Sequence, residues 1–284
     1  MLRSYRLQYH CGGWSVAAAV GDMSGTFDGE RTLVTLLVPA FNESKIFRRN
    51  AEIVEQYVRL HEANYLFELI IVNDGSSDDT GALAEEFARG REELVRVVHH
   101  SKNSGLGAAL RTGFLHARGE IIIPIDLDLS YSVDHLDRLL AARKESGADL
   151  ILLSPYMTAG RTSRVPIHRL LFSRTANTIL SWAQGRRLHT STGMVRAYSR
   201  KLLEKLSLQS SGMEINLEAL LKSILAGAKV KEIPAHLDWE HRSRLCERCF
   251  RISPRRLFRQ MLLVLRYAWL FRKVRPLVIQ KVIV

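Results

Sequence analysis

Two aspartates separated by one leucine follow a short apolar run, and their type and spacing suit metal chemistry. The run at 121–125 is predicted to be a buried strand, because a parallel strand covered on both faces is apolar throughout. Residues two apart on an extended chain point the same way, so Asp126 and Asp128 are expected to present their carboxylates together. Such a pair repels unless a cation neutralises it, and Mg²⁺ is commonly held by one or two carboxylates plus substrate phosphates. The alternative is an ordinary turn with solvated aspartates.

Two further polar turns are predicted at the ends of other strands. The segment Val-Pro-Ala-Phe-Asn-Glu at 38–43 leaves its strand at Pro39, which cannot donate to a sheet ladder. Glu43 is suited to accept from a ribose hydroxyl or a base edge, and its alternative role is a favourable charge at a helix N-terminus. The turn Asn-Asp-Gly-Ser at 73–76 adds another carboxylate, Asp74.

A glycine-containing loop at 100–107, His-Ser-Lys-Asn-Ser-Gly-Leu-Gly, precedes a predicted helix. It offers backbone N–H groups and the ammonium of Lys102 to an anionic group of a nucleotide. Neither a Walker sequence nor G-x-G-x-x-G occurs, so a nucleotide would have to be bound by carboxylates and a metal ion.

Alternating strands and helices must position these loops. Strands are predicted at 33–38, 68–72, 94–99, 121–125 and 149–153, and helices at 44–61, 79–89, 105–118 and 133–146. This alternation predicts an α/β fold with a mostly parallel sheet flanked by helices, which binds ligands beyond the carboxyl ends of its strands. The three polar loops are therefore expected at one edge. After about residue 155 the alternation stops, and only helices at 166–184 and 213–226 and a strand at 229–233 are predicted.

Four segments, VPAFNE, VNDGSSDDT, NSGLGAALRTG and DLDLS, resemble in order and spacing the family 2 inverting glycosyltransferases of GT-A (Rossmann-like) fold. The resemblance covers about residues 33–245 and is closest to the dolichol-phosphate mannose synthase and polyprenyl-phosphate glycosyltransferase branch. It implies a hexosyltransferase that uses a nucleotide-diphosphate sugar of the GDP-mannose or UDP-glucose type. The residues that it implies for the nucleoside are Pro39, Phe41, Glu43 and Asp74. Those that it implies for Mg²⁺ or Mn²⁺ on the diphosphate are Asp126, Asp128 and Ser130.

The second half of the chain departs from the pattern of that branch. The stretch at 190–200 resembles D-x-x-S-G-F-R-x-Y, but Thr190 replaces the acid. Leu-Ser-Pro-Tyr at 153–156 stands where many members have G-S-R-Y, so an arginine is missing. Glu214 matches the acceptor-side helix, and Arg242 matches the arginine of the closing strand. These departures leave the sugar and the acceptor open.

The acceptor decides which further residues take part in catalysis. A phosphate acceptor is already an anionic nucleophile, and Arg161, Arg164, Arg169 and Arg174 are suited to position it because guanidinium groups match phosphate oxygens. Their alternative is a solvated basic helix face. A hydroxyl acceptor would need a general base, for which Glu214 and Asp238 are the candidates. The catalytic candidates are Asp128, Arg164, Glu214 and Arg242.

The net charge of +12 is concentrated at the C-terminus, where residues 241–284 contain 12 Lys and Arg and one acid, Glu247. Arg259, Arg266 and Lys273 recur every seven residues among leucines and aromatic residues, which is typical of a basic amphipathic helix in a membrane interface. No run of 18 uncharged apolar residues occurs, and a nucleic-acid surface would be more polar. Membrane surface is the predicted partner, a homo-oligomer contact or a truncated membrane-spanning region is the alternative, and nucleic acid is not expected.

Three cysteines are too few for a disulfide framework, which favours a reducing cytosol. Cys246 and Cys249 are not accompanied by a second pair of ligands at the spacing of a zinc site.

The predicted organisation is an extension at 1–30, a GT-A domain at 31–245 and a membrane-associating tail at 246–284. Within the domain, 31–153 is the nucleotide-sugar half and 154–245 the acceptor half. The predicted activity is metal-dependent transfer of a hexose to a polyprenyl phosphate by a peripheral protein at the cytosolic membrane face. Transfer to a hydroxyl acceptor such as diacylglycerol, another lipid or a glycan, and a non-catalytic nucleotide-sugar-binding module, are the alternatives.

Overall fold

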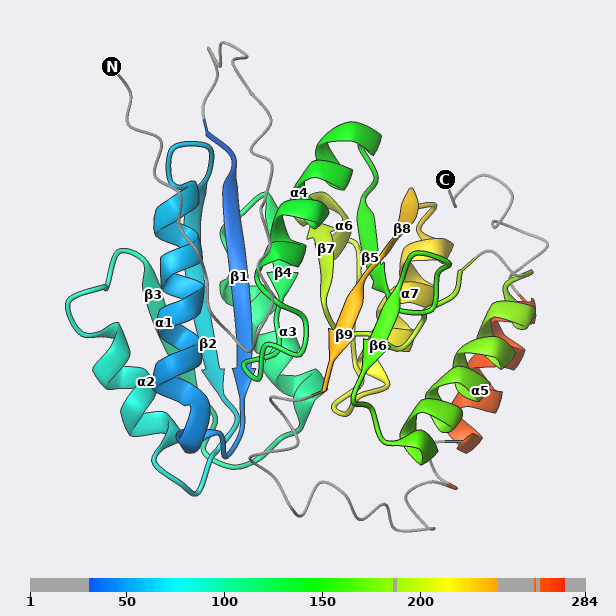
Figure 1. The fold of residues 1–284 in the computed structure, drawn as a ribbon, viewed down its shortest axis with the longest axis horizontal. Coiled ribbons are helices and arrows are strands. Elements are labelled where there is room, and N and C mark those ends of the chain that lie inside the picture. The colour runs from blue at the N-terminus through cyan, green and yellow to red at the C-terminus, as the bar shows by residue number, and fades with distance from the viewer. Residues whose placement is uncertain (1–30, 186–187, 240–257, 259–260, 274–284) are drawn as a thin grey trace. The chain divides into compact units, whose positions relative to one another are not determined.

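A seven-stranded sheet with helices on both faces forms the centre of the protein (Figure 1). The computed structural model describes residues 31–185, 188–239, 258 and 261–273. The strands of the sheet follow the order β3-β2-β1-β4-β7-β5-β8. Their bounds are β1 Leu33–Ala40, β2 Leu66–Asn73, β3 Val95–His99, β4 Ile121–Pro124, β5 Leu150–Ser154, β7 Arg196–Ser199 and β8 Val230–Pro234. The helices are α1 Ser44–His61, α2 Thr80–Ala88, α3 Leu106–His116, α4 Asp134–Ser146, α5 Ile167–Ala183, α6 Arg200–Leu203 and α7 Ile215–Leu225. The predicted α/β class, mostly parallel sheet and flanking helices are confirmed.

Strand β7 differs from the prediction. It lies between β4 and β5 and is antiparallel to both, whereas all other neighbouring strands of the sheet are parallel. Its sequence, Arg-Ala-Tyr-Ser, is short and half polar although all four residues are buried, so it lacks the apolar run by which the other strands were found. A second sheet of two parallel strands, β6 (Arg161–Ser163) and β9 (His236–Asp238), was also missed because each strand has only three residues.

The strand order reverses between β1 and β4, which makes their carboxyl ends the point where an open α/β sheet binds ligands. The ladders align three polar loops at this edge. Asp74 N donates to Ala40 O at 2.9 Å, which joins the loops after β1 and β2, and Ile125 N donates to Leu37 O at 2.9 Å, which joins the exit of β4 to β1. The expectation that the three loops lie along one edge of the sheet is therefore met.

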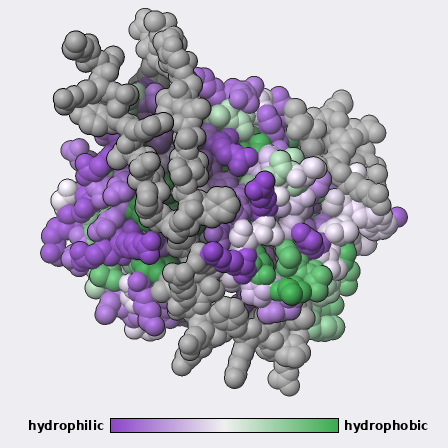
Figure 2. All heavy atoms as spheres, in the orientation of Figure 1, coloured by the Kyte–Doolittle hydropathy of each residue, from purple (hydrophilic) through white to green (hydrophobic). Residues whose placement is uncertain are grey.

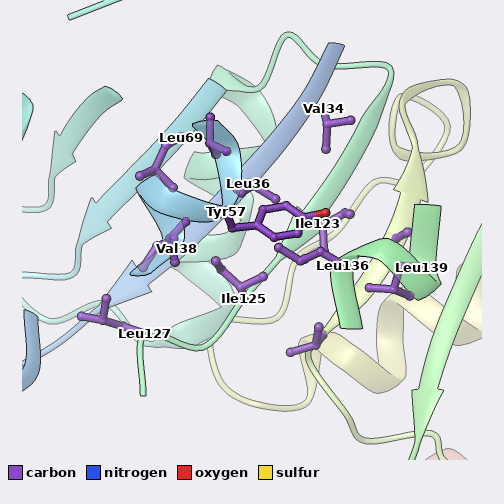
Figure 3. Packing of buried hydrophobic residues seen from close by; sticks show 14 of the residues in the cluster. Val34, Leu36, Val38, Tyr57, Leu69, Ile123, Ile125, Leu127, Leu136 and Leu139 are labelled. Atoms are coloured by element: carbon purple, nitrogen blue, oxygen red, sulfur yellow. The ribbon is translucent and has the colours of Figure 1, made fainter. Parts of the chain in front are cut away.

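Two layers of apolar side chains hold the sheet between its helices. On one face α1, α2 and α4 cover alternate residues of β1 and β4, and Figure 3 shows Tyr57 of α1 and Leu136 and Leu139 of α4 packed around Leu36 and Ile123. On the other face lie α3, α5 and α7. Burial of this apolar surface is the main force that fixes the strand ends in place.

The C-terminal residues 261–273 form a helix that packs on the second face. Val264, Tyr267, Ala268 and Phe271 are buried in the same cluster as residues of α5 and α7. Four of the 13 residues of this helix are thus part of the core, and the predicted division at residue 246 stays a prediction. Arg259 and Leu257 of the predicted amphipathic pattern lie outside the described residues. Within the described part of the chain, no helix is both long and apolar enough to cross a membrane.

The start of α3 packs against the loop at 210–212 without space for side chains. Gly107 N donates to Ser211 O at 2.7 Å, and a Cβ at Gly107 would lie 2.4 Å from Ser210 O and 2.8 Å from Gly212 O. Because these atoms are backbone, the loop itself would have to move. The two glycines at 105 and 107 thus permit contact between the donor and acceptor portions of the chain.

Replacing Gly107 by alanine is expected to lower the free energy of unfolding by about 1–3 kcal/mol, since the new methyl group displaces the 210–212 loop. Urea unfolding followed by circular dichroism measures the change. Leu115→Ala is the matched control on the same helix, because Leu115 is 86% exposed and its loss should change stability little. Equal stability of Gly107→Ala and the parent protein would contradict the close packing.

Candidate active site

The two aspartates lie in a tight turn directly after β4. The strand ends at Pro124, Leu129 N donates to Asp126 O at 3.0 Å, and Leu129 has a φ of 50°. The extended geometry on which the prediction relied therefore does not apply at 126–128. Leu127 is buried in the core, Asp126 is partly exposed, and Asp128 is only 4% exposed. A turn anchored by its central leucine, rather than strand alternation, places the two carboxylates.

Two hydrogen bonds from other elements and one within the turn fix its shape. Asn50 in the middle of α1 donates from Nδ2 to Leu127 O at 2.8 Å, and Asp238 N in β9 donates to Ser130 O at 2.9 Å. Ser130 N donates to Asp128 Oδ1 at 2.9 Å, so Asp128 also shapes its own loop. Asn50 was missed in the sequence, although a polar residue on the buried face of an amphipathic helix was a usable signal.

The donor atoms of this turn suit a hard divalent cation. Asp126, Asp128 and Ser130 offer two carboxylates and a hydroxyl, and oxygen ligands are those that Mg²⁺ and Mn²⁺ prefer. No cluster of three or more His, Cys, Asp and Glu able to hold a metal ion occurs among the described residues. A cation here would thus take its remaining ligands from phosphates and water, as expected for a substrate-bridging ion.

The pKa of the Tyr131 phenol depends on the charges around the turn. Burial raises its pKa far above the ordinary value, and the negative charge of Asp126 raises it further, while the positive charge of Arg196 acts in the opposite direction. The phenol therefore stays neutral at physiological pH. Asp126 and Arg196 thus both lie close enough to Tyr131 for their charges to act on one group.

The loop after β1 is braced against the loop after β2. Asn42, which has a φ of 55°, accepts at Oδ1 from Ser77 N at 2.8 Å and donates from its backbone N to Ser76 Oγ at 3.0 Å. Glu43 N donates to Thr80 Oγ1 at 2.8 Å, at the start of α2. This bracing holds Phe41, whose ring is 44% exposed, and the partly buried Glu43 at the edge of the sheet. Pro39 lies on β1, paired in register with Val72 of β2.

Asp74 is tied to the loop after β3. Its carboxylate accepts from Ser104 N at 2.9 Å and Gly105 N at 2.8 Å, and it lies 2.7 Å from His100 Nδ1. His100 Nε2 lies 2.9 Å from Thr112 Oγ1 of α3, so this histidine connects the turn to the helix. Sequence reasoning missed His100, because a lone histidine has no recognisable spacing.

Several backbone donors of the glycine loop are bonded within the protein. The N–H groups of Ser104 and Gly105 donate to Asp74, and those of Gly107 and Ala108 donate to Ser211 O. These four donors are thus used within the protein. Lys102 remains exposed in the same loop, so its ammonium is the loop's contribution to an anionic ligand.

The predicted acceptor-side residues are dispersed over several elements. Arg164 is exposed, with a φ of 57°, in the loop between β6 and α5. Arg169 on α5 lies over the ring of Trp239, with its guanidinium carbon 5.2 Å from the ring centroid, and Arg174 is exposed on the same helix. The four arginines at 161, 164, 169 and 174 thus do not form one helix face, because β6 and a turn separate the first two from α5.

The two base candidates differ in position. Asp238 is joined through its backbone to Ser130 in the aspartate turn, whereas Glu214 precedes α7 and accepts at Oε1 from Gly212 N at 3.2 Å. Glu218, one turn later on α7, fixes the adjacent loop by accepting from Gln209 N, Ser210 N and Lys222. Burial alone would raise the pKa of Glu218, but these hydrogen bonds outweigh it and lower the pKa to about 2. Arg242 lies outside the described residues.

Comparison with known proteins identifies the family. A model of glycosyl transferase family 2 matches residues 35–207, which run from within β1 to beyond α6 and include both aspartates of the turn. The chain belongs to this family. The polyprenol monophosphomannose synthase of Mycolicibacterium smegmatis is 36% identical over 211 residues, covering 72% of this chain and 76% of that protein. The dolichol-phosphate mannosyltransferase of Pyrococcus furiosus is 28% identical over 205 residues, covering 71% of this chain and 55% of that protein.

Solved structures show that this glycosyl transferase family 2 protein has the GT-A fold. The glucosyl-3-phosphoglycerate synthase of Mycobacterium tuberculosis, solved with Mn²⁺, UDP and glucosyl-3-phosphoglycerate, matches with a TM-score of 0.57 and 21% identity over 85% of this chain and 80% of that one. The mannosyltransferase PcManGT of Pyrobaculum calidifontis, solved with GDP-Man and Mn²⁺, matches with a TM-score of 0.54 and 18% identity over 85% and 72%. The chain is a glycosyltransferase, as the sequence motifs indicated.

His135 links α4 to β9 beside the aspartate turn. Its Nδ1 lies 3.1 Å from Ser132 O, and its Nε2 accepts from His236 N at 3.0 Å, so the neutral ring satisfies both partners. Burial lowers the pKa of His135 and outweighs the opposing hydrogen bond to Ser132. The charge of Arg138 lowers the pKa further, and the smaller effects of Asp134 and His236 have opposite signs. Protonation at Nε2 would turn the acceptor into a donor facing another N–H group.

Acidification is therefore expected to loosen β9. Because the pKa of His135 is lowered in the folded state, the unfolded chain takes up the proton first, and the stabilisation present above about pH 6.5 is lost as the pH falls below it. In His135→Gln the amide oxygen can accept from His236 N without titrating, so the unfolding free energy of this variant should fall less than that of the parent between pH 7.5 and pH 5.

Urea unfolding at both pH values measures this difference, with His116→Gln at the exposed end of α3 as the control for the added glutamine. An identical pH dependence in His135→Gln and the parent protein would contradict the assigned role.

Proposed function

We propose that the protein is an inverting, metal-dependent hexosyltransferase that uses a nucleotide-diphosphate sugar of the GDP-mannose or UDP-glucose type and glycosylates a polyprenyl phosphate. The observation that carries the proposal is the aspartate turn after β4, held at the switch point of the sheet beside the loops after β1 and β2. The names of the relatives support the acceptor, since they are a polyprenol monophosphomannose synthase and a dolichol-phosphate mannosyltransferase.

The loops after β1, β2 and β3 would bind the donor. Phe41 offers an exposed ring, and Glu43 a carboxylate, beside Pro39 at the end of β1. Asp74 would act on the nucleoside together with the loop that it fixes, and Lys102 would approach the phosphates as a mobile point charge. The rigid bracing between Asn42 and Ser77 would preserve this geometry before the nucleotide arrives.

Asp126 and Asp128, with Ser130, would hold Mg²⁺ or Mn²⁺. When bound, such an ion neutralises negative charge that develops on the departing nucleoside diphosphate. In the transfer itself, a phosphate oxygen of the acceptor forms a bond to the anomeric carbon while the bond from that carbon to the diphosphate oxygen breaks. An anionic acceptor needs no base, and Arg164 is the proposed ligand of its phosphate because it is exposed near β9 and the aspartate turn.

Radiolabelled sugar nucleotide, polyprenyl phosphate and Mn²⁺ should give a labelled lipid that mild acid releases. Asp128→Asn should lower the rate at least about 100-fold, since metal neutralisation of the leaving group is worth several kcal/mol. Glu145→Gln on the exposed face of α4 is the matched control for loss of one carboxylate. Unchanged, Mn²⁺-dependent turnover in Asp128→Asn would refute the metal site. A labelled lipid that resists mild acid would refute the phosphate acceptor.

A hydroxyl acceptor is the second candidate, and the position of Asp238 favours it. Its backbone is bonded to Ser130, so a carboxylate-bearing residue adjoins the metal turn and would serve as the general base. Two results together would favour this candidate over the first. The parent protein would transfer the sugar to diacylglycerol and not to polyprenyl phosphate, and Asp238→Asn would lose the transfer to diacylglycerol.

We further propose that α5 and the C-terminal helix lie on the cytosolic membrane surface. Large apolar side chains are exposed on both: Ile167, Leu171, Trp182, Phe258, Leu262, Leu265 and Trp269. The guanidinium carbon of Arg272 lies 4.5 Å from the ring centroid of Trp182, so the two helices adjoin, and Figure 2 shows apolar side chains gathered on this side of the molecule. Residues 166–185 and 258–273 contain no Asp or Glu, which suits anionic lipid headgroups.

Leu265→Asp with Trp269→Asp is expected to weaken binding to phosphatidylglycerol vesicles at least about tenfold, because it places two charges in the apolar surface of the interface. Cosedimentation measures the binding. Leu115→Asp, an equally polar exchange at an exposed leucine of α3, is the control and should bind like the parent. Equal loss in both variants would show that net charge, and not this surface, determines membrane binding.

A further inference from the structure

Arg196 is the most deeply buried cation at the carboxyl edge of the sheet. It is the first residue of β7, and its side chain is 1% exposed. Because β7 is antiparallel to β4, its amino end lies at the edge where β4 ends. Ile122 pairs with Tyr198, and continuing this register places Arg196 opposite Pro124, from which the aspartate turn departs.

The partners of Arg196 are neutral. It donates from one terminal nitrogen to Asn216 O at 2.8 Å, at the start of α7, and from the other to Ser191 O at 2.6 Å. No carboxylate forms an ion pair with it within the part of the chain that the structure describes. Two carbonyl dipoles solvate the guanidinium without a carboxylate in direct contact, and a buried charge without a bonded counter-ion is costly to maintain.

The position of Arg196 directs this charge toward the site, because β7 brings the residue level with Pro124 at the start of the aspartate turn. Thr190 is buried beside Ser191, and its hydroxyl is bonded to Ser154 Oγ at 2.7 Å, so it brings no negative charge to the position where the family resemblance expects an acid. The buried carboxylate of Glu232 accepts from Thr190 N at 2.6 Å and lies 2.9 Å from His189 Nδ1, so its contacts are with these two residues and not with Arg196.

We infer that Arg196 is a positioning residue that attracts a phosphate-group anion of the substrates to the aspartate turn without touching it. This inference rests on the proposed nucleotide-sugar site. A permanent charge in surroundings of low polarity acts over a longer distance than an exposed one, because water and salt do not screen it. The anion is the diphosphate of the donor or the phosphate of the acceptor, and both have the same chemistry.

Three variants of the full chain test this in the presence of Mn²⁺. In Arg196→Met the affinity for the nucleoside diphosphate (UDP or GDP, whichever the parent binds) should fall about tenfold, the order expected for one buried charge that acts at a distance. Affinity for the uncharged nucleoside with the same base should be unchanged. Arg196→Lys keeps the charge and should retain most of the diphosphate affinity. If the role of Arg196 were purely structural, Arg196→Met would lower the affinity for the nucleoside and for the diphosphate by the same factor.

The acceptor is examined separately through its KM at saturating donor. A rise in this KM with unchanged diphosphate affinity identifies the acceptor phosphate as the anion and supports the inference. Equal loss of nucleoside and diphosphate affinity in Arg196→Met, or a Lys variant as weak as the Met variant in both arms, would overturn it. A parent protein that binds neither UDP nor GDP contradicts the proposed function itself, independently of Arg196.

Thr190→Asp keeps the test decisive where Arg196→Met does not fold. The new carboxylate would cancel the charge of Arg196, and diphosphate affinity should fall relative to the neutral control Thr190→Asn while nucleoside affinity stays equal in the two. Equal diphosphate affinity in the Asp and Asn variants would overturn the inference.

Discussion

The burial of Leu127 between two aspartates is the constraint on which the site depends. Its side chain is anchored in the core that Figure 3 shows, next to Val38 and Ile125, so the turn cannot lift away from the sheet without exposing apolar surface. Asn50 and Asp238 then fix the turn from α1 and from β9. Hydrophobic burial thus supplies the force that keeps two mutually repelling carboxylates at one sheet edge, and hydrogen bonds supply the orientation.

Much of the polar sequence around this turn serves the loops themselves. Asp74, His100 and the N–H groups of 104–105 form one closed set of hydrogen bonds, and Ser211 O takes the first donors of α3. Glycines at 105 and 107 allow the close backbone approach of the 210–212 loop. A loop whose donors are already satisfied is rigid, and rigidity lowers the entropy lost when a ligand binds.

The sequence was sufficient for the features that local pattern encodes. Long apolar strands such as β1 and β2, amphipathic α1 and the order of the polar loops were predicted nearly to their observed bounds, because burial on both faces leaves a continuous apolar run. Strand β7 could not be predicted, since its burial comes from two neighbours distant in the chain. The same holds for Arg196, whose bonds to two backbone carbonyls are a property of packing, and for the C-terminal helix, where Phe271 proved to be core. The roles of Glu214 and Arg164 remain proposals.

The antiparallel strand also has a consequence for the order in which the chain acquires structure. Strand β5 has no neighbour on the donor side until β7 is present, because β7 alone joins it to β4. During synthesis from the N-terminus, β4 therefore has an open edge until residues 196–199 have emerged, and an unpaired edge invites association with other chains. The donor half consequently cannot complete its sheet alone. This interval lasts while the roughly seventy residues between β4 and β7 are synthesised.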